Sequence, residues 1–458
     1  MYQYKGEDDT IAAIITPAGS GGVGIVRVSG KDTAGVVSRI FTGKSCGAPS
    51  EWRAYSIHYG WIKAEAGDVI DEVLVAWMPG PKSYTCEDVA EISGHGGPAV
   101  IRLILNHCLQ AGARLAAPGE FTKRAFLNGR IDLAQAEAVL DIITARTEAG
   151  VRAVERQLKG DLSVELETLR AMLLGVLGGI EALLNFPEED TDAGQAGKVV
   201  RDMALILTRL DALLSTAPRG RILKEGIRVV ICGKPNVGKS SLLNALLRAP
   251  RAIVTDVAGT TRDVIEECVN IDGIPVNLVD TAGILVPRDK VEEEAVRRSR
   301  EAIASADIVL CVLDQSCPLD ETDRALIAGI SHPRRIMVLN KADLPSGLGH
   351  DVFEGSPKVS ALRRDGMDEL RRAMVRMATG DAAVEARGVL VNDARHAEAL
   401  QGAKEALQRA KHAALQGDPL EFSAEDIKAA VNALDAITGR HVDADVIDHI
   451  FAKFCIGK

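Results

Sequence analysis

Hydrophobic positions follow different spacings in different parts of the chain. Over residues 1–122, short β-branched runs such as IAAII (11–15) and DEVLVAW (71–77) are separated by Gly- and Pro-rich stretches, which predicts strands joined by turns. From residue 132 to about 214, and again after about 381, apolar residues recur every three or four positions. This second spacing predicts amphipathic helices.

Between the two helical stretches, apolar strands alternate with helices. The predicted strands are RVVICG, NLVD, IVLCVLD, RIMVLN and VSAL, all within residues 228–362, and one helix follows Lys239. Such alternation is typical of a doubly wound parallel sheet. Residues 216–226, which contain Pro, Gly and charged residues, are predicted to be a linker in front of the first strand.

The expected fold is therefore multidomain, α/β and α. Because the termini of a domain usually lie close together, an α/β domain can be inserted between helices of one bundle. We predict an N-terminal α+β domain (1–122), the first part of a helical domain (123–220), an inserted α/β domain (221–380) and the second part of the helical domain (381–458).

Composition narrows the class of protein. The 458 residues are 47% hydrophobic and 26% charged, with a net charge of −10, so a surface that binds polyanions throughout is excluded. The eight cysteines form no C-x-x-C pair, and the acidic start MYQYKGEDDT lacks the basic and apolar regions of a secretory signal. We expect a cytoplasmic protein with no structural zinc and no membrane span.

Residues 233–240 read GKPNVGKS, a G-x-x-x-x-G-K-[ST] phosphate-binding loop placed between a strand and a helix. In such a loop backbone N–H groups surround the phosphates, Lys239 neutralises the β and γ oxygens, and Ser240 binds Mg²⁺. The motif DTAG (280–283) adds a carboxylate near the metal and an N–H near the γ-phosphate.

Two later motifs select the base. In NKAD (340–343), the Asp343 carboxylate accepts both N–H donors of guanine, a pair that adenine does not offer, and Ser360-Ala361 follows another predicted strand. We therefore predict a GTPase that binds GTP and not ATP. The GTP-binding residues predicted from these motifs are Asn236, Val237, Gly238, Lys239, Ser240, Ser241, Asp280, Thr281, Ala282, Gly283, Asn340, Lys341, Asp343, Ser360 and Ala361.

The residues after DTAG are Ile284 and Leu285, whose apolar side chains cannot orient an attacking water as the Gln of many GTPases does. Asn236 offers an amide oxygen that, with loop carbonyls, can hold a monovalent cation against the developing charge. The alternative is that Asn236 only stabilises the turn of the loop.

A second glycine pattern resembles a dinucleotide-binding motif but does not predict one. Gly19, Gly21 and Gly24 fit G-x-G-x-x-G, but the alternating IVRVS follows them, whereas a dinucleotide fingerprint must open a helix. We expect no Rossmann site there.

Over essentially its whole length the chain resembles the family of tRNA-modification GTPases called MnmE or TrmE. Besides the GTPase motifs and TDVAGTTRD (255–263), the resemblance rests on four segments outside the α/β domain. These are DTIAAIITPAGSGGVGIVRVSG, YTCEDVAEISGHGGP, PGEFTKRAFLNGRIDLAQAEAVLDIITARTEA and the final FCIGK. A GTPase of another family would not explain them.

The resemblance implies an N-terminal domain that dimerises and binds a folate, such as 5-formyltetrahydrofolate or a related tetrahydrofolate, and hydrolysis of GTP that potassium stimulates. It implies potassium ligands at Asn236, Thr255, Val257 and Thr260, magnesium ligands at Ser240 and Thr261, and folate-binding residues at Arg27, Glu91, Arg130 and Lys458. It also adds to the GTP-binding residues the segment Thr255, Asp256, Val257, Ala258, Gly259, Thr260 and Thr261. Glu292 matches a glutamate that positions water, although Glu293 or Glu294 remains an alternative by spacing. Cys455 matches a thiol near the folate, and its alternative role is that of a buried small apolar residue.

By the same resemblance, the protein acts as a homodimer with an FAD- and NADH-using partner of the MnmG or GidA type. Together they would attach an aminomethyl-type (carboxymethylaminomethyl) group to the wobble uridine of certain tRNAs, taking the carbon from the folate. The GTPase motifs alone also permit a regulatory or ribosome-assembly GTPase without modification chemistry. A folate-dependent transferase that acts on another substrate is a third possibility, which dependence on tRNA would separate from the first.

Overall fold

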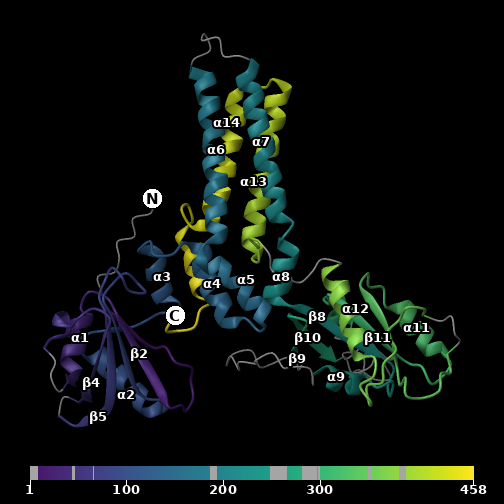
Figure 1. Cartoon of the computed structure of the whole chain (residues 1–458), viewed down its shortest axis with the longest axis horizontal. Coiled ribbons are helices and arrows are strands. Elements are labelled where there is room, and N and C mark those ends of the chain that lie inside the picture. Colours follow the sequence, from purple (N-terminus) through teal and green to yellow (C-terminus); the bar gives the residue numbers. More distant parts are fainter. Residues whose placement is uncertain are drawn as a thin grey trace. The chain divides into compact units, whose positions relative to one another are not determined.

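The computed structural model describes residues 9–43, 47–64, 67–185, 193–247, 266–280, 297, 300–348, 353–380 and 388–458 (Figure 1). These residues form two compact units. Unit 1 comprises Met1–Leu140, Leu158–Met203 and Glu405–Lys458, and unit 2 comprises Asp141–Gln157 and Ala204–Lys404. No helix among the described residues is both long and apolar enough to cross a membrane.

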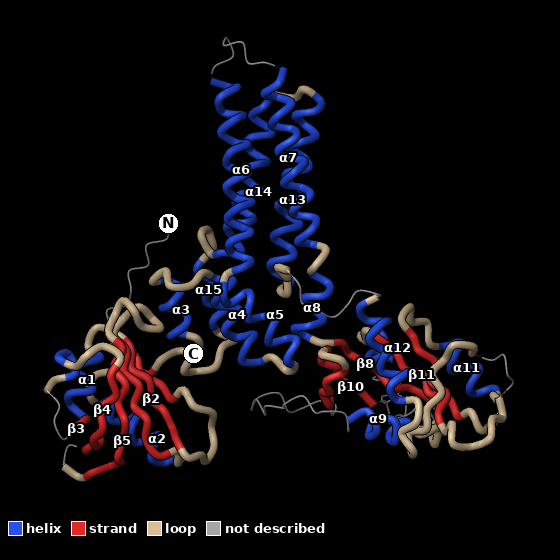
Figure 2. Tube along the Cα trace, in the orientation of Figure 1, coloured by secondary structure: helices blue, strands red, loops and turns tan. Residues whose placement is uncertain are grey.

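Unit 1 contains a seven-stranded sheet in the order β3-β4-β5-β6-β2-β1-β7 (Figure 2). Its strands are β1 (Ile11–Ile14), β2 (Val23–Ser29), β3 (Phe41–Gly43), β4 (Ser56–Lys63), β5 (Val69–Met78), β6 (Val89–His95) and β7 (Arg114–Leu115). Helices α1 (Thr33–Ile40) and α2 (Pro98–Gln110) bury Val36 and Ile104 in one core with Val26 and Ile92 of the sheet. The strand β2 confirms that the glycine pattern before it opens no helix.

The rest of unit 1 is helical. Helix α6 (Asp161–Asn185) packs along α14 (Leu420–Thr438), so helices that are more than 200 residues apart in the sequence lie together. Helix α3 (Glu120–Leu127) packs on α15 (Ala444–Phe451). The other helices with residues in unit 1 are α4 (Leu133–Thr144), α5 (Glu148–Lys159), α7 (Ala193–Leu214) and α13 (Ala394–Gln416).

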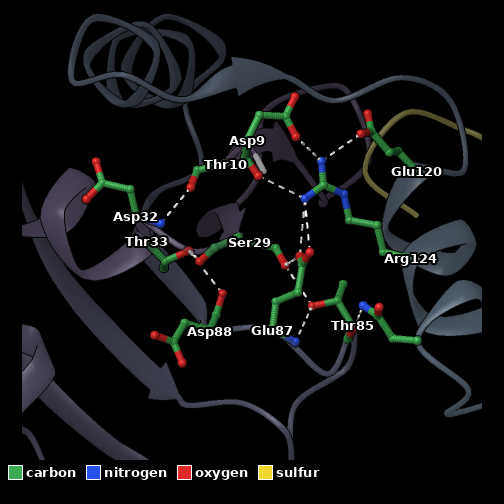
Figure 3. Close-up of polar contacts among 12 residues, drawn as sticks. Asp9, Thr10, Ser29, Asp32, Thr33, Thr85, Glu87, Asp88, Glu120 and Arg124 are labelled. Carbon is green, nitrogen blue, oxygen red and sulfur yellow. Dashed lines mark hydrogen bonds and ion pairs between the residues drawn. The ribbon is translucent and has the colours of Figure 1, made fainter. Parts of the chain in front are cut away.

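A buried polar network ties α3 to the sheet of unit 1 (Figure 3). The Arg124 side chain is 7% exposed and donates to Asp9 Oδ1 at 2.6 Å, Glu120 Oε1 at 2.9 Å and Glu87 Oε1 at 3.2 Å. Ser29, at the end of β2, donates to Glu87 at 2.8 Å. A single guanidinium therefore pairs with carboxylates from three separate segments, and Arg114 adds a second cation beside Asp9 and Glu120.

Unit 2 contains a five-stranded sheet in the order β12-β11-β8-β10-β9. The strands β8 (Ile227–Gly233), β10 (Ile274–Asp280), β11 (Ile308–Asp314) and β12 (Arg335–Asn340) are parallel, and β9 (Glu266–Ile271) pairs antiparallel with β10. Helices α8 (Ala217–Glu225), α9 (Lys239–Leu247), α11 (Glu321–Gly329) and α12 (Met367–Thr379) accompany it. The predicted alternation of strands and helices is confirmed, together with the multidomain fold class.

Two local predictions are wrong. The expected linker at 216–226 contains helix α8, because Pro218 lies in the first turn, where its missing N–H costs nothing. Gly226 ends that helix with a φ of +80°. The segment VSAL (359–362) is not a strand, since Ser360 forms only an isolated bridge with Asp365.

Candidate functional site

The parallel strands of unit 2 bring the predicted GTP-binding motifs to one edge of the sheet. Gly233 ends β8, Asp280 ends β10 and Asn340 ends β12. Register places Asp280 opposite Ile231 of β8 and Asn340 opposite Asp314 of β11, so these carboxyl ends are level. In open α/β sheets this edge is where ligands bind.

The phosphate-binding loop has the backbone that its sequence predicts. Gly233, Asn236 and Gly238 have φ values of +156°, +63° and +93°, a region that glycine enters without strain. A Cβ atom on Gly238 would lie 2.3 Å from the Asn340 side chain, so only glycine fits there. Asn236 is exposed and takes the left-handed conformation that asparagine tolerates.

Lys239 and Ser240 begin helix α9, directly after the loop. The Lys239 Nζ donates to the carbonyls of Gly233 at 3.1 Å and Lys234 at 2.9 Å, so the ammonium lies within the curve of the loop. Burial lowers the pKa of Lys239, while the negative charge of Asp280 opposes that shift. The ammonium is positioned to meet an anion bound in the loop.

Ser240 and Asp280 fit a magnesium site. The Ser240 hydroxyl donates to Asp280 Oδ2 at 3.2 Å, and Asp280 Oδ1 is buried with no hydrogen-bond partner among the described residues. Hydroxyl and carboxylate oxygens are ligands that Mg²⁺ prefers. An unsatisfied carboxylate oxygen beside such a hydroxyl is what a bound cation would explain.

The base-binding motif is held by its own hydrogen bonds. Asn340 Nδ2 donates to the Val237 carbonyl at 2.8 Å, and Asn340 Oδ1 accepts from the Ala361 N–H at 3.1 Å. The Ser360 hydroxyl donates to Asp343 Oδ1 at 2.6 Å and holds the pKa of that carboxyl below its usual range. Asp343 therefore stays an ionised acceptor at neutral pH, as recognition of guanine requires.

The remaining predicted GTP-binding residues in the described part of the chain also lie at this edge of the sheet. Ser241 is exposed in the first turn of α9, and the Lys341 ammonium lies 2.5 Å from Asp314 Oδ2. The other predicted residues lie outside the described part of the chain. They are Thr255, Asp256, Val257, Ala258, Gly259, Thr260, Thr261, Thr281, Ala282, Gly283 and Glu292.

A second site in unit 1 gathers the residues expected to bind folate. Arg27 of β2 faces Glu91 of β6 in the sheet register, and their side chains form an ion pair of 2.8 Å. The Arg27 guanidinium lies 5.2 Å from the ring centre of Tyr84, and Arg130 lies 4.7 Å from the same ring. Arg130 also donates to the Tyr84 carbonyl at 3.1 Å.

The last residues of the chain pack beside this second site. The Phe121 N–H donates to the Lys458 carbonyl at 3.2 Å, and the Gly119 N–H donates to the Cys455 carbonyl at 3.3 Å. Phe121 in turn lies 5.4 Å from the Arg27 guanidinium, measured from its ring centre. Cys455 is a free, exposed thiol, which contradicts the alternative of a buried small apolar residue.

Sequence reasoning missed Tyr84 and Phe121. Both aromatic rings contact the Arg27 guanidinium, an arrangement that fixes a cation by its interaction with π electrons. Tyr84 lies in the segment YTCEDVAEISGHGGP that carries the family resemblance. That segment was the one available signal, because no spacing rule pairs an arginine with a distant tyrosine.

Two family models match the chain. One is described as the MnmE helical domain and matches residues 133–455. The other is described as the GTP-binding protein TrmE N-terminus and matches residues 10–130.

Three relatives, each called tRNA modification GTPase MnmE, are similar over 98% of this chain and 99% of their own. The protein from Roseiflexus sp. strain RS-1 is 46% identical over 465 residues. Those from Roseiflexus castenholzii and Alkaliphilus oremlandii are 45% and 44% identical.

Among solved structures, the similarity covers a smaller part of the chain. Era from Aquifex aeolicus, bound to GDP and AlF4⁻, aligns with 39% of this chain and 66% of its own at 24% identity and a TM-score of 0.27. The G domain of the FeoB iron transporter from T. maritima aligns with 33% of this chain and 99% of its own at 23% identity and a TM-score of 0.26.

Proposed function

The chain belongs to the MnmE family of tRNA modification GTPases, and on that premise we propose that its GTP hydrolysis serves modification of the wobble uridine in certain tRNAs. The product is a carboxymethylaminomethyl or related aminomethyl group at the 5-position. The observation that supports this most is the presence of two separate sites in one chain. A nucleotide site lies in unit 2, and a cluster of cations with an exposed thiol lies in unit 1.

At the nucleotide site, one set of residues binds the phosphates and magnesium, and another set binds the base. Loop N–H groups and Lys239 bind the phosphates, Ser240 with Asp280 and Thr261 holds magnesium, and Asp343 selects guanine. Asn236, Thr255, Val257 and Thr260 hold a potassium ion that balances charge in the transition state. Glu292 orients the attacking water, a task that apolar Ile284 and Leu285 cannot perform.

At the second site, Arg27, Arg130 and Lys458 supply positive charge for the carboxylates of a folate, and Glu91 accepts N–H bonds from its pterin. The folate, 5-formyltetrahydrofolate or a related tetrahydrofolate, supplies the one-carbon unit when bound. Cys455 is the nucleophile that activates the uracil ring. The protein works as a homodimer with an FAD- and NADH-using partner.

Replacing Cys455 by Ser is expected to abolish the modification while leaving GTP hydrolysis within about twofold of the native rate. The reason is that a serine hydroxyl has little nucleophilic strength at neutral pH compared with a thiol. The measurement is nucleoside mass spectrometry of tRNA from cells that lack the native protein and express the variant.

Cys317→Ser is the matched control, because Cys317 is also a free, exposed thiol and lies in the other unit. It should restore the modified nucleoside fully. If the nucleoside is unchanged in cells without the protein, the chain is a regulatory GTPase instead. If Cys455→Ser restores it as fully as Cys317→Ser does, the thiol has no catalytic role.

Replacing Arg130 by Ala is expected to weaken binding of 5-formyltetrahydrofolate about 10- to 100-fold, because a charged hydrogen bond contributes roughly 1.5–3 kcal/mol. Titration calorimetry measures this directly. Arg53, an exposed arginine in unit 1, provides the control Arg53→Ala. Equal affinities of the two variants would remove Arg130 from the site.

A further inference from the structure

The phosphate-binding loop is tied to the rest of unit 2 at two points. The first tie is the hydrogen bond from Asn340 Nδ2 to the Val237 carbonyl, which belongs to the base-binding motif already described. The second tie starts at Lys234, the residue after the first glycine of the loop. No motif assigns a function to this position, which the phosphate-loop pattern leaves as x.

The Lys234 side chain reaches away from the loop to the beginning of α11. Its Nζ lies 2.7 Å from Asp320 Oδ2 and 2.7 Å from Asp323 Oδ2. Asp320 is the N-cap residue of α11 and forms a reciprocal capping box with Asp323. The ammonium therefore joins the loop to a helix start in which each of the two carboxylates accepts a hydrogen bond from the backbone N–H of the other residue.

This tie is more than a surface ion pair. The Lys234 side chain is 21% exposed and that of Asp323 is 8% exposed, so water screens this pair only in part, whereas Asp320 is 57% exposed. Burial alone would lower the pKa of Lys234, but its bonds to Asp320 and Asp323 outweigh that effect and raise it. The ammonium keeps its charge throughout the neutral range.

The backbone carbonyl of Lys234 faces Lys239 of the phosphate-binding loop and not helix α11. It accepts the hydrogen bond of 2.9 Å from Lys239 Nζ, the cation that meets the phosphates. The side chain of one residue thus anchors to α11 while its carbonyl holds Lys239. Between these two lysines, Asn236 and Gly238 take the left-handed conformation, and the hydrogen bond from Asn340 to Val237 holds the middle of the loop.

We propose that Lys234 is a positioning residue of the GTP site, which holds the phosphate-binding loop and Lys239 in the geometry that binds phosphates by anchoring the loop to Asp320 and Asp323. It touches no phosphate itself. Its contribution comes from organising the donors before the nucleotide binds, so that less order has to be gained on binding.

Replacing Lys234 by Met tests this in the full-length protein. The affinities for GTP and for GDP are both expected to fall about tenfold, since both nucleotides use the loop and would have to order it and the Lys239 side chain on binding. Lys234→Arg preserves the charge and the reach and should remain within about threefold of native affinity. The preference for GTP over XTP should not change, because Asp343 and Ser360 are untouched.

Removing Lys234 also leaves the Asp323 carboxylate without its cation, which can lower stability by itself. The double variant Lys234→Met, Asp323→Asn removes that charge, and it should still bind GTP about tenfold more weakly. Arg324→Met makes the same change of charge at an exposed position of α11 and should bind normally. A double variant that binds both nucleotides with native affinity, whatever its melting temperature, overturns the proposal.

Discussion

An Asp343→Asn variant is expected to lose GTP binding by at least about 100-fold and to bind XTP instead. The carboxylate accepts two N–H donors from guanine, whereas an asparagine side chain offers one acceptor and one donor group. That donor would face the guanine amino group, and a site with unmatched polar groups rejects its ligand strongly. Xanthine carries an oxygen in place of the amino group and matches the asparagine.

Competition against a fluorescent GTP analogue measures both changes. In the native protein GTP should displace the probe, and ATP should fail to do so at comparable concentration. Asp365→Asn is the control, because Asp365 is an exposed aspartate close to Ser360. An Asp343→Asn variant with native affinity for GTP would show that another group recognises the base.

Replacing Arg124 by Met is expected to lower the free energy of unfolding of the N-terminal sheet by about 3 kcal/mol, because Glu87 loses this ion pair and Asp9 and Glu120 keep only Arg114. Three carboxylates, those of Asp9, Glu87 and Glu120, accept hydrogen bonds from this guanidinium (Figure 3). Arg124 is among the few charged side chains buried in the described part of unit 1.

The tryptophans of the chain provide a fluorescent probe for this measurement. All three tryptophans, Trp52, Trp61 and Trp77, lie in or beside the sheet of unit 1, so urea unfolding followed by tryptophan fluorescence reports on that sheet. Arg102→Met, at an exposed position of α2, should change stability by less than about 0.5 kcal/mol. Equal midpoints for the two variants would contradict the role of the network.

The same network is expected to make the stability of the fold depend on pH in the acidic range. Burial opposes ionisation of Asp9 and Glu120, but hydrogen bonds from Arg114 and Arg124 outweigh it and hold the pKa of each below the ordinary values of 3.8 and 4.5. As pH falls, the unfolded state takes up protons first. The stability that these two groups contribute is therefore complete above about pH 4.5 and is lost as pH falls through their folded-state values.

The sequence alone predicted the nucleotide-binding motifs, because each motif is a run of neighbouring residues at the end of a strand. The loop at 233–240, Asp280 after its strand and Asn340 after the next all meet at one edge because parallel strands of similar length end together. The error at 216–226 came from treating Pro218 as a breaker, although in the first turn of a helix proline is favoured. The presence of a proline in a segment does not by itself tell whether it lies in the first turn of a helix or in a linker.

Other features depend on tertiary contacts that no local pattern reports. Cys455 stands between apolar residues, yet Phe454 is 4% exposed and Ile456 is 52% exposed, so its neighbours did not reveal that it faces solvent. Tyr84 contacts Arg27 and Arg130 across three separate segments. The tie from Lys234 to Asp320 joins residues that are far apart in sequence.

The packing of α6 against α14 also sets an order of events during synthesis. The leucines of α6, among them Leu162, Leu166 and Leu169, are almost fully buried in the finished protein, but their partner helix leaves the ribosome only after the whole five-stranded sheet. At 5–20 residues per second this delay is on the order of ten seconds or more. The nascent chain therefore carries an exposed leucine face that chaperones can bind, and the sheet of unit 2 can fold before the segment that bears Cys455 exists.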